Sequence, residues 1–141
     1  MKSVQAVIYD KDEKKYLLIK RRGYSDKNFL WRLVKGRVED NEDEINALKR
    51  EIKEETGLDK IKVVGRIWEY TYMTKDFGKT NVSAFLVIAE KREKLEKQDE
   101  NEDIKEYKWV DFKTAQKMLF FEEEKESIKK AERLNHSPIS Q

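Results

Sequence analysis

The chain has 141 residues, which is enough for one domain with a sizeable hydrophobic core. Its 31 basic and 29 acidic side chains leave a formal net charge of +2, a balance that gives no sign of a general nucleic-acid or acidic-membrane binder. The absence of cysteine excludes disulfides and thiolate metal sites. Residues 1–10 lack the apolar core of a signal peptide, and no apolar run is long enough to span a bilayer, so we expect a cytoplasmic protein.

Alternating apolar residues predict the first strands of a sheet. We expect strands over residues 4–9, 16–20 and 31–34, with a polar turn after the first strand and a loop at 23–28 before the third. The third strand runs directly into Gly36, and we expect this glycine to let the chain turn toward the element that follows.

A helix is predicted after this turn, and it ends at Gly57, a glycine in the position that commonly terminates helices. Asn41 or Asp43 could cap its first turn. The face of this helix that packs on the core is predicted to consist of Ile45, Leu48 and Ile52.

The second half of the chain predicts two further strands, 61–73 and 81–90, with a turn at 75–79 between them. An exposed charged connection over 91–103 leads to a last strand at 107–110. Two helices, 113–119 and 122–134, come next, and the second is predicted to turn Ile128, Ala131 and Leu134 inward. We therefore expect one α+β domain over 1–135, with a mixed β-sheet clasped between helices, and a disordered tail at 136–141.

The first predicted helix gathers carboxylates on one side. A helix turns about 100° per residue, so Glu54 and Glu55 return to the side of Glu51, and Glu44 points nearly the same way. Like charges at this spacing repel by roughly 0.2–0.5 kcal/mol per pair on an exposed helix. Most glutamate-rich helices are simply solvated surfaces. Here, however, the lysines project from another face and the carboxylates lie beside the apolar face, so the helix is suited to binding a cation.

A longer pattern surrounds these carboxylates, and its chance occurrence is on the order of one in ten million per window. It is G-x5-E-x7-R-E-U-x-E-E-x-G-U, where U is apolar, and the chain fits it without departure from Gly36 to Leu58. This pattern is the Nudix box, and the chain resembles the Nudix hydrolases. The resemblance implies an α/β/α sandwich with a mixed sheet, and metal-dependent hydrolysis of a compound that contains a nucleoside diphosphate linkage.

The resemblance also implies the metal site. Glu51, Glu54 and Glu55 would be its ligands, with Gly36 counted in the same site, and Glu51 and Glu54 would share the catalytic role with Arg50, which orients a catalytic glutamate. Carboxylate oxygens are hard ligands that suit Mg²⁺, or Mn²⁺, better than zinc.

Related enzymes often use another acid, outside the box, as a general base or extra ligand. Asp103 stands at the expected offset from Tyr107 and Trp109, and Glu102 is the neighbouring alternative. Within the box, Glu42 is either an outer ligand or a support of the loop. The single histidine, His136, falls in the predicted tail and is not expected to act in catalysis.

Four segments resemble the diadenosine tetraphosphate hydrolase branch: Trp31-x-x-x-Lys35-Gly36, Tyr70-x-Tyr72, Tyr107-x-Trp109 and Leu119-Phe120-Phe121. Relatives usually have proline where this chain has Val34. We expect Lys35 to reach a phosphate, and Tyr70, Tyr72 and Phe121 to bind the substrate. Stacking on adenine contributes roughly 1–3 kcal/mol per base. The alternative for Tyr70 and Tyr72 is core packing, because alternate residues of a strand face inward.

The activity that these residues favour is cleavage of diadenosine tetraphosphate to ATP and AMP. The alternatives are a pyrophosphohydrolase of RNA 5′ ends or nucleoside triphosphates and, in another class, a non-catalytic nucleotide-binding module with the same fold. An ADP-ribose pyrophosphatase is less favoured, because that group carries a proline downstream of the box and the only proline here is Pro138. We expect a small nucleotide substrate, no membrane partner, nucleic acid only if an RNA 5′ end is the substrate, and a monomer or homodimer.

Overall fold

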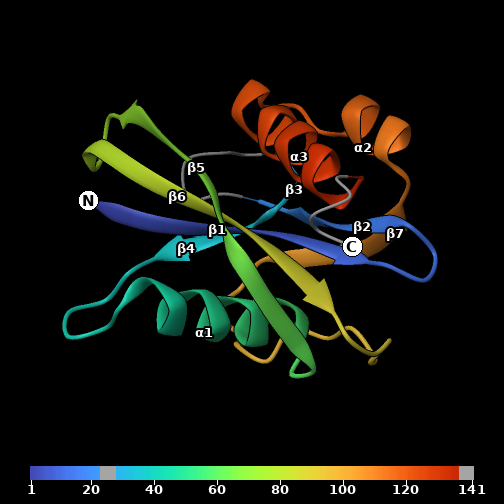
Figure 1. The fold of residues 1–141 in the computed structure, drawn as a ribbon. Helices are drawn as coiled ribbons and strands as arrows, with labels where there is room; N and C mark the ends of the chain where they lie inside the picture. Colours follow the sequence, from blue (N-terminus) through green and yellow to red (C-terminus); the bar gives the residue numbers. More distant parts are fainter. Residues whose placement is uncertain (23–27, 137–141) are drawn as a thin grey trace.

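Seven strands form one mixed sheet at the centre of the protein, in a computed structural model that describes residues 1–22 and 28–136. The strands are β1 (Lys2–Asp10), β2 (Lys15–Arg21), β3 (Leu30–Arg32), β4 (Val34–Arg37), β5 (Ile61–Thr74), β6 (Gly78–Ala89) and β7 (Ile104–Val110). The helix α1 (Glu44–Thr56) covers one face, and α2 (Phe112–Met118) and α3 (Glu122–Asn135) cover the other (Figure 1). The expected α+β architecture is confirmed.

The strand β1 is the centre of the sheet, whose order is β3-β2-β1-β6-β5. It runs parallel to β6 and antiparallel to both β2 and β4, and nearly all of its residues are buried. Since side chains alternate across a strand, Val4, Ala6 and Ile8 join the core under α1, whereas Val7 and Tyr9 join the core under α2 and α3.

The predicted strand at 31–34 is two strands in the structure. β3 pairs with β2, with Trp31 opposite Lys20, and β4 pairs with β1, with Lys35 opposite Gln5. The chain changes partner at the buried Leu33, so it crosses from the edge of the sheet to its centre within a few residues. This crossing brings Lys35 and Gly36 next to α1.

The helix α1 has the ends that the sequence predicts. The Asp43 carboxylate accepts a hydrogen bond from the backbone of Asn46 at 2.8 Å, and Gly57 ends the helix in the left-handed region with φ of 79°. Leu48 and Ile52 are buried as expected, but Ile45 is 37% exposed. Leu134 was also expected to face inward but is 39% exposed. Both residues lie in a terminal turn of their helix.

The charged connection between β6 and β7 forms neither helix nor strand, as expected. It crosses the end of α1, where the backbone N–H of Glu96 donates to Thr56 O at 3.0 Å and that of Gln98 donates to Glu54 O at 2.7 Å. These hydrogen bonds satisfy carbonyls that the helix leaves open at its C-terminus. The connection is therefore fixed beside the carboxylates of α1.

The predicted loop at 23–28 and the predicted tail at 136–141 lie outside the described residues, apart from Asn28 and His136. His136 follows the last turn of α3. None of the helices in the described part of the chain is long and apolar enough to cross a membrane.

Candidate active site

Three carboxylates converge beside the C-terminal half of α1. Glu51, Glu54 and Glu102 each place one oxygen within 4.8 Å of the others. Glu102 comes from the connection that is hydrogen-bonded to the end of the helix. Burial, and secondly the negative charge of Glu51, raise the pKa of both Glu54 and Glu102. A cation bound here would relieve this repulsion, and we call the three residues the acidic cluster.

Glu55 lies beneath the acidic cluster with no exposed surface. Within residues 1–22 and 28–136, neither of its carboxylate oxygens has a hydrogen-bond partner, and the Nη1 of Arg21 lies 3.8 Å away. Burial raises the pKa of Glu55 well above its usual value. A buried carboxylate without donors is costly unless it is neutral or bound to a cation, and its hard oxygens suit Mg²⁺ or Mn²⁺.

Glycine is required at position 36 because the Glu51 side chain approaches the backbone there, and not because the chain turns at this residue as we expected from the sequence. Gly36 is a strand residue of β4 opposite Val4, and its φ is not in the left-handed region. A β-carbon at this position would overlap the carboxylate of Glu51. Only glycine therefore lets Glu51 lie against the backbone of β4, so the first residue of the box contacts a glutamate from its helical part.

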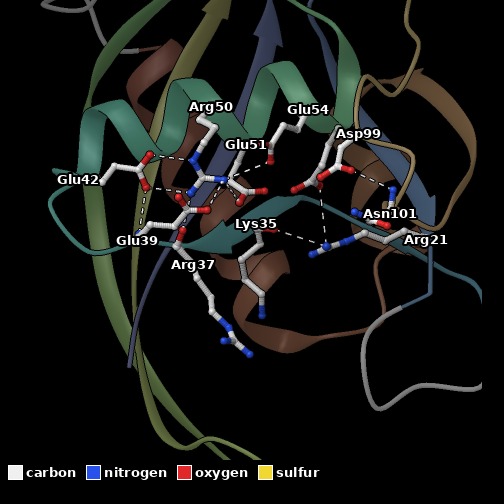
Figure 2. A network of polar contacts seen from close by, with 11 residues as sticks. Arg21, Lys35, Arg37, Glu39, Glu42, Arg50, Glu51, Glu54, Asp99 and Asn101 are labelled. Atoms are coloured by element: carbon white, nitrogen blue, oxygen red, sulfur yellow. Dashed lines mark hydrogen bonds and ion pairs between the residues drawn. The ribbon is translucent and has the colours of Figure 1, made fainter.

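Arg50 is enclosed by carboxylates and carbonyls (Figure 2). Its Nε and Nη2 donate to the two oxygens of Glu42 at 2.7 and 2.9 Å, and its Nη1 donates to Glu51 at 2.8 Å and to Glu54 at 3.2 Å. Its Nη2 also donates to Arg37 O at 2.8 Å. The hydrogen bonds from Arg50 lower the pKa of Glu42 to about 2. Arg50 thus fixes two members of the acidic cluster, and Glu42 holds Arg50 from the other side.

Asp103 does not join the acidic cluster. Its carboxylate pairs with the Nη2 and Nε of Arg22 at 2.6 and 2.8 Å and is partly exposed. The sequence prediction of Asp103 counted residues back from Tyr107. That count crosses a register shift in β7, where Lys20 pairs with Glu106 but Arg21 pairs with Ile104. One extra residue reverses which side chains face α1. Glu102 consequently faces the helix and Asp103 faces away.

A cavity of about 650 Å³ adjoins the acidic cluster, on the side of β4 away from α1. Glu51 and Glu102 form one part of its wall, and residues of β1 to β4, of the β5–β6 hairpin and of the start of α3 form the other parts. Its basic residues are Arg21, Arg32, Lys35 and Arg37, and its aromatic residues are Tyr70, Tyr72, Phe77 and Phe121. A concave site that combines cations, rings and carboxylates can bind a phosphorylated aromatic ligand.

Lys35 has no carboxylate within ion-pair distance in the described part of the chain. Its Nζ donates to the hydroxyl of Tyr72 at 2.8 Å and lies 4.5 Å from the centroid of that ring. Burial, followed by the charges of Arg32 and Arg21, lowers the pKa of Lys35 to about 8. A cation held this way is available to an anionic ligand.

The rings expected to bind substrate all line this cavity, and two of them also pack. The hydroxyl of Tyr70 accepts a hydrogen bond from Gln5 Nε2 at 2.7 Å, and its ring lies 4.9 Å from that of Trp68. Phe121 lies under the guanidinium of Arg32 at 4.3 Å, whereas Phe120 is 64% exposed and outside the cavity lining.

Four of the basic and aromatic cavity residues were not predicted from the sequence: Arg21, Arg32, Arg37 and Phe77. Arg32 is buried and donates to Glu124 at 2.7 Å, and Glu124 also accepts from the backbone of Leu33 at 2.9 Å. Arg32 and Glu124 lie far apart in the sequence, so no local sequence pattern predicts that they pair.

Comparisons with known proteins identify the family of the chain. The family model described as "NUDIX domain" matches residues 1–131. The solved structure of a C. elegans Ap4A hydrolase binary complex has a TM-score of 0.77 at 23% identity, over 92% of this chain and 93% of that one. The E. coli dihydroneopterin triphosphate pyrophosphohydrolase has a TM-score of 0.76 at 21% identity, over 91% and 92%.

The MutT protein from Methanosarcina mazei Go1 has a TM-score of 0.72 at 19% identity, over 97% of this chain and 96% of that one. Likeness at these identities shows the shared fold. None of the curated proteins compared with the chain matches it. Because the family model spans most of the sequence and the intact box forms one site, the chain belongs to the Nudix family and is a hydrolase that acts on acid anhydrides.

Proposed function

We propose that the protein hydrolyses dinucleoside polyphosphates, with diadenosine tetraphosphate cleaved to ATP and AMP by attack of water on phosphorus. The observation that carries this proposal is that one cavity joins carboxylates suited to divalent ions, a half-buried cation without a carboxylate partner among the described residues, and several aromatic rings. A nucleoside polyphosphate matches each of these features. The fold shared with a solved Ap4A hydrolase is in line with it.

Mg²⁺, with Mn²⁺ as a substitute, is the cofactor that this donor set fits. Glu51, Glu54 and Glu55 would hold it, with the backbone of Gly36 alongside and Glu102 contributing from outside the helix. Two observations support the fit: the oxygens of Glu55 are buried without donors in the described ranges, and Glu51 lies against Gly36. When bound, such an ion polarises a phosphoryl oxygen and lowers the pKa of a bound water.

Arg50 is a positioning residue in this proposal, because its hydrogen bonds to Glu51 and Glu54 fix both carboxylates. We assign to Glu102 the role of general base that the sequence placed at Asp103. Glu102 is the member of the acidic cluster that comes from outside α1, and its carboxylate can accept a proton from the attacking water. Asp103, through its pair with Arg22, would hold the start of β7.

The substrate would lie along the other wall of the cavity. Lys35 would neutralise the phosphate chain, since it is next to Gly36 and its Nζ has only the Tyr72 hydroxyl as a hydrogen-bond partner in the described part of the chain. One adenine would stack among Tyr70, Tyr72 and Phe121, which line the same cavity.

The test is turnover of diadenosine tetraphosphate with Mg²⁺, with the products separated by ion-exchange chromatography. We expect ATP and AMP in equal amounts, and a loss of activity of about 10²-fold or more in Glu55→Gln. Glu100→Gln is the matched control, because Glu100 is exposed and lies outside the acidic cluster.

Other outcomes would change the assignment. ADP as the sole product would mean that the bond cleaved lies in the middle of the tetraphosphate. Faster turnover of a nucleoside triphosphate or of 5′-triphosphorylated RNA in parallel reactions would replace the substrate class. Tight nucleotide binding without turnover under Mg²⁺ or Mn²⁺ would indicate a non-catalytic binding module.

A further inference from the structure

The rim of the cavity carries a stacked pair that the reaction proposed above does not use. The guanidinium of Arg37, in β4, lies 3.9 Å from the centroid of the Phe77 ring, at the tip of the β5–β6 hairpin, and both residues line the cavity. We propose that Arg37 and Phe77 form a second nucleobase subsite, for the nucleoside at the far end of a dinucleoside polyphosphate. This inference rests on the proposed function and deepens it.

In the described part of the chain, the Arg37 side chain makes a single interaction, its stacking contact with Phe77. It is exposed, and no carboxylate of the described ranges pairs with it, whereas Arg21, Arg32 and Arg50 each lie beside a glutamate. The backbone oxygen of Arg37 accepts a hydrogen bond from Arg50, but its side chain points away from Arg50 and the carboxylates around it (Figure 2). The guanidinium is therefore available to a ligand.

The backbone that carries the Phe77 ring is held in place before any ligand arrives. The backbone N–H of Phe77 donates to the hydroxyl of Thr74 at 3.0 Å, and Gly78 follows in the left-handed region with φ of 68°. Thr74 itself lines the cavity. A turn fixed at both sides of Phe77 lets the ring serve as a stacking platform with little loss of conformational entropy on binding.

The position of the pair suits the far end of a long substrate. Arg37 follows Gly36, whose backbone touches Glu51, so the pair begins one residue from the acidic cluster. Lys35 and Arg37 alternate with Gly36 along β4 and point to the same side, away from α1 (Figure 2). Phe77 lies nearer the hairpin tip than Tyr72, which contacts Lys35. A phosphate chain that passes Lys35 can therefore continue to Arg37.

The chemistry of the pair selects a planar ring more than a bare phosphate. A guanidinium is flat and stacks on aromatic faces, so the face of Arg37 turned away from Phe77 can accept a nucleobase. An aromatic base in such a stack contributes roughly 1–3 kcal/mol. A mononucleotide bound at Tyr72 and Phe121 would leave this platform empty.

The experiment compares two ligands that differ only in the second nucleoside. Methylene-bridged, non-hydrolysable analogues of diadenosine tetraphosphate and adenosine tetraphosphate would be titrated into the protein with Mg²⁺ by calorimetry. We expect Arg37→Ala and Phe77→Ala to raise Kd for the dinucleoside analogue by at least about fivefold, and for the mononucleoside analogue by less than about twofold. Arg37→Lys keeps the charge but not the plane, and should not restore binding.

Two substitutions serve as controls. Arg133→Ala removes an exposed arginine in the last turn of α3, and Val64→Ala removes an exposed apolar side chain of β5 outside the cavity lining; neither should change Kd for either analogue. Equal losses for both ligands, no loss for either, or full rescue by Arg37→Lys would each overturn the second subsite. Because binding is measured without turnover, a subsite that behaves as expected in a protein that does not cleave diadenosine tetraphosphate would overturn the proposed function alone.

Discussion

The carboxylate of Glu51 lies against the backbone of Gly36, in the space that a β-carbon would fill. Gly36→Ala must therefore displace the end of a flexible side chain that also accepts a hydrogen bond from Arg50. We expect kcat to fall by about tenfold or more, as when a group that orients a metal ligand is lost, while Tm falls by only a few degrees. Gly65→Ala is the matched control, because no atom lies within 4 Å of that site. Unchanged kcat in Gly36→Ala would mean that the approach of Glu51 to β4 is not needed.

The pair of Glu42 with Arg50 predicts a specific loss of stability in acid. Hydrogen bonds from Arg50 lower the folded-state pKa of Glu42 from 4.5 to about 2. The stabilisation that this pair provides is thus fully present above pH 4.5 and is lost as the pH falls toward 2. The free energy of unfolding, measured with denaturant between pH 2 and 5, should depend less steeply on pH in Glu42→Gln than in the wild type. Parallel curves for the two proteins would contradict the assignment.

Because Glu55 is buried, Glu55→Gln should affect Tm differently in the metal-free protein and in the presence of Mg²⁺. In the metal-free protein, Glu55→Gln removes an ionisable group that has no exposed surface and no hydrogen-bond donor among the described residues, so Tm should stay the same or rise. Mg²⁺ at roughly 100 times Kd should stabilise the wild type by about 2.7 kcal/mol, which raises Tm by about 5–10 °C. This rise should disappear in Glu55→Gln and persist in Glu100→Gln. Thermal scans with EDTA and with Mg²⁺ measure both effects.

The neighbours Glu102 and Asp103 should differ sharply when each is made neutral. Glu102→Gln removes a carboxylate from the acidic cluster, so kcat should fall by about tenfold or more. Asp103→Asn breaks a partly exposed pair with Arg22, which contributes no more than about 1 kcal/mol, and should leave kcat nearly unchanged. The pH–rate profile of Glu102→Gln should also lose its acidic limb. A large loss of kcat in Asp103→Asn alone would restore the role that the sequence suggested.

These two acids illustrate which parts of the protein could be predicted. Element types and the box follow from local periodicity and fixed spacing, so β1, α1 and its caps were confirmed. The choice between Glu102 and Asp103 depends on a register shift opposite Arg21, which no pattern within the segment reveals. Similarly, the division of 31–34 depends on two different partner strands. The cavity wall also depends on a contact between residues far apart in the sequence, the hydrogen bond from Arg32 to Glu124.

A buried network connects the cavity wall to α3 and provides the last prediction. Trp68 Nε1 donates to Ser127 Oγ at 2.8 Å, Ser127 Oγ donates to Gln5 Oε1 at 2.6 Å, and Gln5 Nε2 donates to the hydroxyl of Tyr70 at 2.7 Å. Ser127→Ala would leave an indole N–H and a buried amide oxygen unsatisfied, at a cost of about 1–3 kcal/mol, or about 3–10 °C in Tm.

The same substitution should affect the cavity, because Gln5 would no longer be fixed and would position Tyr70 less well. KM should therefore rise in Ser127→Ala with little change in kcat. Tyr70→Phe removes the hydroxyl at the other end of the network, so its effect on KM should be less than additive with that of Ser127→Ala. A double-mutant cycle on KM and Tm measures this coupling. Full additivity would mean that the network stabilises the fold but does not position Tyr70, since a purely structural role would lower Tm and leave KM unchanged.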